Sequence, residues 1–113
     1  MAFSLDPTNG YTVTVANSGT AVAGPAIPDN AHTIIIYNSH ASNDLFLRWQ
    51  TANTAITSAN GTTIPAQTAL TLSIGCRSQR PQGDTGGVAN ALWYDASGNG
   101  TAAFVTTVNG IVT

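Results

Sequence analysis

Asp84-Thr85-Gly86 is the part of the sequence whose residue types and order most directly suggest chemistry. Asp-Thr-Gly is the active-site tripeptide of aspartic proteases, in which two carboxylates share one proton. There the tripeptide lies on a tight turn after an apolar strand, whereas here it follows a polar segment that contains Pro81. The context favours a polar surface loop, and a hydrolase that uses Asp84 is the enzymatic alternative.

Metal binding or thiol chemistry would depend on His32, His40 and Cys76, because the chain has two histidines and one cysteine. A structural zinc site usually has four ligands and a catalytic one at least three from the protein. Hydrogen-bonded histidines in turns are the simpler interpretation, and we expect no metal and no cofactor. Cys76 cannot form an internal disulfide and is expected to be a small buried side chain.

Four aromatic residues, Tyr37, Trp49, Trp93 and Tyr94, could form a platform on which a sugar stacks. Strand aromatics also fill the core of β-sandwiches, and we favour this role for Trp49. Adjacent residues of a strand point to opposite faces. One ring of the Trp93-Tyr94 pair should therefore lie outside the main core, where it can contact a partner.

The longest polar stretch, residues 77–90, contains two of the three arginines. Arg77, Arg80 and Asp84 are the best candidates in it for specific polar contacts, and a solvated loop without a partner is the alternative. We expect none of these residues to be catalytic.

Charge is scarce throughout the chain. It has three Arg, five Asp and neither Lys nor Glu, so 7 % of its residues are charged, whereas about 25 % is usual. With 42 % apolar residues and little self-repulsion, charge-driven disorder is excluded. A net charge of −2 provides no basic surface for nucleic acid. With so few charged side chains, a monomer has little electrostatic protection against association. We therefore expect much of its surface to be covered by other copies of the chain or by a larger assembly.

The length of 113 residues predicts a single domain over residues 1–113. We see no basic, apolar signal segment at the N-terminus and no apolar stretch near the ~18 residues that a membrane helix requires. The sequence therefore predicts synthesis in a cytoplasm and no membrane partner.

Alternating apolar residues predict the strands that must position these groups. Residues 51–63 are expected to be irregular, and Asn99-Gly100, a pair typical of type I′ turns, predicts a hairpin between the last two strands. About eight short strands with turns every 8–12 residues predict an all-β fold, an antiparallel two-sheet β-sandwich that is jelly-roll-like. The predicted strands are 11–16, 20–24, 33–37, 44–50, 70–74, 92–94 and 102–108.

The strand at residues 33–37 is apolar on both faces, which predicts a central strand or one at an interface. Because side chains alternate, Ile35 and Tyr37 should face away from Ile34 and Ile36.

The order of these elements resembles the small β-sandwich decoration, or cement, proteins of tailed-bacteriophage capsids. The resemblance covers residues 30–108. It rests on Ile34 to Ser39, the strand that ends at Trp49, Ile64-Pro65-Ala66 before Leu70-Thr71-Leu72, and Leu92 to Gly98 before the last strand. It implies a jelly-roll-like fold, no catalysis and binding across joints between major capsid protein subunits on the outer surface of the virion. Such proteins are often dimers or trimers.

The residues and the resemblance together predict a non-enzymatic virion protein that cements a capsid. Its expected partners are the major capsid protein and itself, as a homodimer or homotrimer. Residues 1–9 could form an N-terminal arm that adds a strand to a neighbour. The alternative is a carbohydrate-binding or host-attachment module, in a head fibre or tail component. The candidate interface residues are Phe3, Leu5, Ile35, Tyr37, Phe46, Arg77, Arg80, Asp84 and Trp93.

Overall fold

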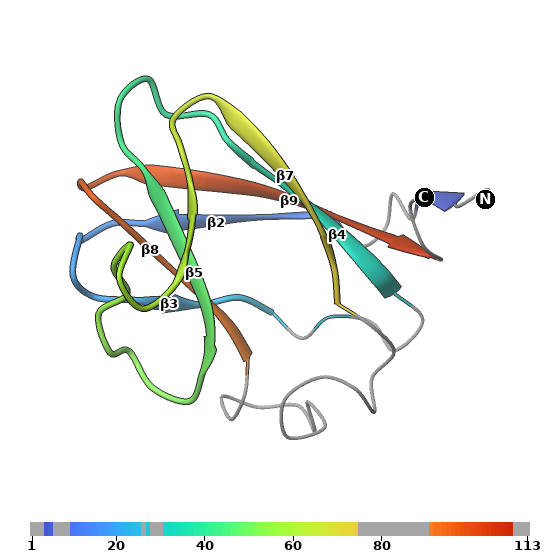
Figure 1. Ribbon diagram of the computed structural model, residues 1–113, viewed down its shortest axis with the longest axis horizontal. Coiled ribbons are helices and arrows are strands. Elements are labelled where there is room, and N and C mark those ends of the chain that lie inside the picture. The colour runs from blue at the N-terminus through green and yellow to red at the C-terminus, as the bar shows by residue number, and fades with distance from the viewer. Residues whose placement is uncertain (1–3, 6–9, 26, 28–30, 75–90, 110–113) are drawn as a thin grey trace.

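A computed structural model describes residues 4–5, 10–25, 27, 31–74 and 91–109 of the chain (Figure 1). The described residues form strands and no helix, as the alternating pattern predicted. The strands are β1 (Ser4–Leu5), β2 (Tyr11–Val15), β3 (Val22–Ala23), β4 (Ala31–Asn38), β5 (Leu45–Gln50), β6 (Thr62–Ile64), β7 (Thr68–Ser73), β8 (Ala91–Ala96) and β9 (Thr101–Asn109).

The strands form two antiparallel sheets that pack face to face as the two layers visible in Figure 1. One sheet has the order β2-β9-β4-β7, with β1 also paired to β9, and the other has the order β3-β8-β5-β6. The second strand therefore pairs with the ninth, the third with the eighth, the fourth with the seventh and the fifth with the sixth. This nested pairing is that of a jelly roll, so the predicted fold class is confirmed.

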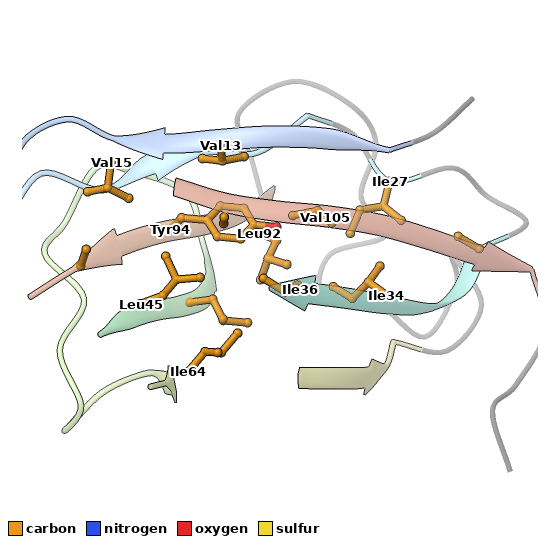
Figure 2. Close-up of a cluster of buried hydrophobic side chains, with 14 residues drawn as sticks. Val13, Val15, Ile27, Ile34, Ile36, Leu45, Ile64, Leu92, Tyr94 and Val105 are labelled. Atoms are coloured by element: carbon orange, nitrogen blue, oxygen red, sulfur yellow. The ribbon is translucent and has the colours of Figure 1, made fainter. Parts of the chain in front are cut away.

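The core lies between the sheets, where inward side chains of both layers meet (Figure 2). Ile34 and Ile36 of β4 are fully buried, whereas Ile35 is half-buried and Tyr37 is exposed. The predicted alternation is confirmed, and β4 is central because it lies between β9 and β7. Each fully buried valine, leucine or isoleucine stabilises the fold by roughly 1.5–3 kcal/mol. The core residues include Val13, Val15, Ala103 and Val105 from one sheet and Leu45, Leu47, Leu92 and Tyr94 from the other.

The expected hairpin at Asn99-Gly100 is wrong. Strand β8 before this turn belongs to one sheet and β9 after it to the other. The turn is instead a corner between the layers, in which Gly100 has a φ of 77° and donates its N–H to the carbonyl of Val15 at 2.9 Å. The Asn99 side chain accepts a hydrogen bond from the Ser18 N–H at 2.8 Å, which ties this corner to the one between β2 and β3.

Two further elements differ from the sequence prediction. Part of the segment expected to be irregular forms β6, which pairs with β5 from Leu45↔Ile64 to Leu47↔Thr62. At the N-terminus, β1 pairs with β9 of the same chain, Ser4 opposite Asn109. The N-terminal arm thus adds a strand to its own sheet in this structure.

Candidate functional site

The outward-facing side of the β2-β9-β4-β7 sheet, called here the outer face, carries no charged side chain among the described strand residues. Seven of its residues are exposed, and Ile35, Ala102 and Thr106 are half-buried. Threonines predominate because β-branched residues suit a pleated surface. The residues of the outer face are Thr12, Thr14, Ile35, Tyr37, Ala69, Thr71, Ser73, Ala102, Phe104 and Thr106.

Tyr37 and Phe104 are the aromatic centre of the outer face. They occupy directly opposed positions on β4 and β9, and they are 42 % and 45 % exposed. These two are the exposed large hydrophobic residues of the described chain. Exposed aromatic side chains with a polar surround are typical of interaction surfaces. The tertiary structure therefore presents an uncharged surface that could bind a partner over the middle of the sheet.

Trp93 and Phe46 lie outside the main core, on the far side of the other sheet. They form a second cluster with Ala21 and Ile56, and their exposed fractions are 7 % and 9 %. The loop after β5 covers them through Ile56, which is 2 % exposed. As predicted, Trp93 and Tyr94 point to opposite faces, but the chain's own loop leaves Trp93 and Phe46 little surface for a partner.

Asp95 holds this loop in place. Its Oδ1 accepts hydrogen bonds from the N–H groups of Gly19 at 3.0 Å and Ala96 at 2.8 Å, and its Oδ2 accepts one from the N–H of Ile56 at 2.9 Å. The residue is 1 % exposed. A buried carboxylate must be compensated by donors, and here three segments of backbone supply them. The role of Asp95 is therefore structural.

The histidine of the β4–β5 turn is part of a polar network at one end of the sandwich. His40 Nδ1 accepts hydrogen bonds from the N–H groups of Ser42 at 3.1 Å and Asn43 at 2.9 Å. Asn38 is fully buried and donates its amide to the carbonyls of Asn43 and Ile64. His40 is thus a hydrogen-bonded turn histidine, as expected. The same expectation is wrong for His32, which lies in β4 and whose buried Nδ1 has no hydrogen-bond partner among the described residues. Among the described residues, no three His, Cys, Asp or Glu side chains gather where they could hold a metal ion.

Tyr94 and Tyr11 form a buried pair, with their hydroxyl oxygens 3.3 Å apart. Burial raises the pKa of Tyr94 far above that of a free tyrosine, and the neighbouring Tyr11 hydroxyl raises it further. Burial also raises the pKa of Tyr11, and the hydrogen bond with Tyr94 offsets part of that shift. Neither ring is available to stack on a ligand, since both belong to the core or pack against it.

Trp49 occupies the end of β5, where it is half-buried and packs against the core. On one side it borders a cavity of about 250 Å³ that opens between the sheets. On the other side it lines an open hollow with Arg48, Gln50 and Thr51. The Gln50 amide donates to two carbonyls of the following loop, at 2.7 and 2.8 Å. Its Oε1 is buried and has no hydrogen-bond partner among the described residues.

The aromatic platform considered from the sequence does not assemble. Tyr94 is in the core, Trp93 is under the loop, Trp49 borders the hollow, and Tyr37 lies on the other sheet. Among the described residues, the hollow beside Trp49 combines an aromatic ring with polar groups, as sugar sites do.

The predicted interface residues are only partly assessed by the structure. Ile35 and Tyr37 lie together on the outer face, and the backbone of Leu5 pairs with Val108. Phe46 and Trp93 lie in the second cluster under the loop. The other four, Phe3, Arg77, Arg80 and Asp84, lie outside the described residues, as does Cys76.

The sequence prediction missed Phe104. It precedes Val105, which is buried in the core with an exposed fraction of 2 %. The argument that separated Trp93 from Tyr94 separates Phe104 from Val105 in the same way, so alternation along the last strand would have placed one of these two outside the core.

Comparisons with known proteins add little beyond this geometry. No protein-family model matches the sequence, and no curated protein does. Among solved structures, the chain is similar to one from a study of Bacillus endospore appendages that form disulfide-linked pili. The identity is 8 %, the match covers 99 % of this chain and 90 % of that chain, and the TM-score is 0.48. In the described part of the chain, no helix is long and apolar enough to cross a membrane.

Proposed function

We propose that this chain is a non-enzymatic structural protein that decorates and cements a bacteriophage capsid by binding across joints between major capsid protein subunits. The outer face carries the proposal, with Tyr37 and Phe104 exposed side by side on an uncharged, threonine-rich sheet. Such a surface can dock against a subunit without the desolvation cost of buried charges. The resemblance to decoration proteins supports the same role, on the outer surface of the virion.

Many copies of the protein on one shell would make binding through the outer face effective. Each contact can be modest, because many copies on one shell share the same subunits and strengthen one another. The outer face carries hydroxyl groups on threonine and serine side chains, which can hydrogen-bond to a subunit around the aromatic centre.

Replacing the aromatic centre should weaken shell binding while the fold is retained. The double variant Tyr37→Ser/Phe104→Ser should weaken binding by about tenfold or more, because buried aromatic anchors dominate protein interfaces. The measurement is co-sedimentation with undecorated shells of the major capsid protein encoded in the same genome. Asn53→Ala, an exposed change on the opposite side of the sandwich, is the control and should bind like the wild type. Equal binding by all three proteins would exclude the outer face.

A second candidate function is carbohydrate binding, which the hollow beside Trp49 favours. It combines an indole, a guanidinium, an amide and a hydroxyl group, from Trp49, Arg48, Gln50 and Thr51. Sugar sites combine an apolar ring face with a few placed polar groups. A module of this kind would attach a virion to its host.

The hollow can be tested with a glycan array. If it binds sugar, Arg48→Ala should lose at least about tenfold in affinity for any glycan that the wild type retains. The side chain of Arg48 is exposed, so this change should leave the fold intact. Tyr37→Ser, on the other sheet, is the control and should keep the wild-type affinity. Absence of glycan binding by the wild type would remove this candidate.

A further inference from the structure

The edge strand β7 ends the β2-β9-β4-β7 sheet and has one ladder partner in the described chain, β4. Its six residues, Thr68–Ser73, contain no charge, proline or glycine. Natural proteins usually protect such an edge with lysine, proline, a bulge or a short length. The other sheet ends in β3 and β6, which have two and three residues and are followed closely by Pro25 and Pro65. The open edge at β7 thus lacks the protection that those two strands have.

The free hydrogen-bonding groups of β7 can be identified from one hydrogen bond. Ile74 donates its N–H to the carbonyl of His32 at 2.8 Å, which continues the β4–β7 register. In an antiparallel ladder, hydrogen-bonded and non-hydrogen-bonded positions alternate. The backbone groups of Leu70 and Leu72 therefore point toward β4, and those of Ala69, Thr71 and Ser73 point away from it.

The inward side of this edge is incompletely covered. Leu70 and Leu72 are half-buried, whereas Val13 and Val15 of β2, at the opposite edge of the sheet, are 5 % and 0 % exposed. The cavity of about 250 Å³ opens beside β7, with Leu72, Ser73 and Ile74 in its wall. Apolar surface thus remains exposed next to the unpaired backbone at this edge.

We propose that β7 pairs antiparallel with β7 of a second copy of this chain, about a two-fold axis at Thr71. In this register Thr71 lies opposite the partner's Thr71, and Ala69 lies opposite the partner's Ser73. Each of these positions points its N–H and C=O outward, so three hydrogen-bonded pairs supply six backbone hydrogen bonds. Leu70 lies opposite the partner's Leu72, and the pair covers the apolar surface beside the cavity.

A second copy is the occupant because β7 is symmetric about Thr71. The order small, Leu, Thr, Leu, small from Ala69 to Ser73 reads the same in both directions, so every position meets a side chain of its own kind. A two-fold axis at this point keeps both outer faces on the same side of one continuous sheet. The inference concerns association in solution and does not depend on the capsid or glycan proposals.

Sedimentation equilibrium tests this pairing without any shell. The wild type should reach a dimer of twice the 11.5 kDa chain mass as its concentration rises from about 1 µM to about 1 mM, a range that covers weak to moderate association. Thr71→Lys should raise the dissociation constant about tenfold or more, because two like charges would be directly opposed. Thr71→Glu should do the same, and an equimolar mixture of the two variants should restore a dimer. Thr14→Lys is the matched control, an exposed threonine at the opposite edge of the sheet, and should dimerise like the wild type.

Amide hydrogen exchange supplies an independent readout. The N–H groups of Ala69, Thr71 and Ser73 should exchange more slowly in the dimer, while those of Leu70 and Leu72 are already bonded to β4. A wild type that is monomeric over the whole range would overturn the proposal. Equal disruption by Thr14→Lys, or polymers that grow with concentration instead of a closed dimer, would also overturn it, since polymers require β7 to pair with a different edge.

Discussion

Asp95→Ala should lower the free energy of unfolding by roughly 3–5 kcal/mol. The substitution removes the acceptor for three backbone N–H groups, of Gly19, Ile56 and Ala96. Those of Ile56 and Ala96 are buried, and each buried donor left without a partner costs about 1–3 kcal/mol. Denaturation by urea at neutral pH measures the change. Asp95→Asn keeps one carbonyl oxygen but turns an amide donor toward a backbone donor, so it should cost roughly half as much.

Asp44→Ala is the matched control for Asp95. Asp44 is half-buried in a turn, and its backbone N–H and carbonyl, which the substitution retains, bond to Ser97 at 2.8 and 3.0 Å. It should lose much less stability than Asp95→Ala. Release of the loop that Ile56 anchors should also expose Trp93 and shift tryptophan fluorescence to longer wavelength in Asp95→Ala alone. Equal stability losses at the two aspartates would show that the carboxylate of Asp95 does not hold the loop.

Alkaline pH should destabilise the fold steeply through the Tyr11–Tyr94 pair. Both hydroxyls have a pKa raised by burial in the folded chain, whereas in the unfolded chain tyrosine ionises near pH 10. The pair therefore contributes stability that is fully present below about pH 10. Above that pH the unfolded state loses protons first, and stability falls by about 1.4 kcal/mol per pH unit for Tyr94 alone.

The composition makes this pH dependence unusually easy to measure. The chain has no lysine, and its arginines stay charged throughout the range. In a Cys76→Ser background, urea denaturation between about pH 8 and pH 11.5 should give a shallower alkaline slope for Tyr94→Phe than for its parent, by about 1.4 kcal/mol per unit. At pH 7 the two should differ by only about 1 kcal/mol, the worth of one hydrogen bond. Identical alkaline slopes would contradict a raised pKa for Tyr94.

Sequence patterns predicted the all-β class, the two-sheet sandwich and most of the strands, because alternation has a period of two residues and is read locally. The faces of β4 illustrate this: neighbouring side chains must point opposite ways, so Ile34 and Ile36 could be separated from Ile35 and Tyr37, although only the structure showed which pair is buried. The same rule, applied to the last strand, would have separated Phe104 from Val105. The cement role, the glycan alternative and the partners remain proposals that the fold does not decide.

Which strands pair with each other could not be predicted from local sequence patterns. Asn99-Gly100 has the residues of a hairpin turn. Whether the next strand pairs within the same sheet or joins the other sheet depends on strands far away in sequence. Here β2 and β4 occupy both sides of β9, so β8 cannot pair with it. The structural role of Asp95 could not be predicted from the sequence either, because the residues that donate hydrogen bonds to it, Ile56 and Gly19, are 39 and 76 residues away in the chain.

The sequence by itself determined a β-sandwich whose surface is poor in charge, because few residues are charged and apolar residues alternate with a period of two. Only the tertiary structure decided which parts of that surface stay open. Trp93 is covered by Ile56 from a distant loop, Tyr37 is left exposed beside Phe104, and β7 is left with one free edge. Burial depends on what packs over a side chain, and long-range packing is not encoded in the period of a strand.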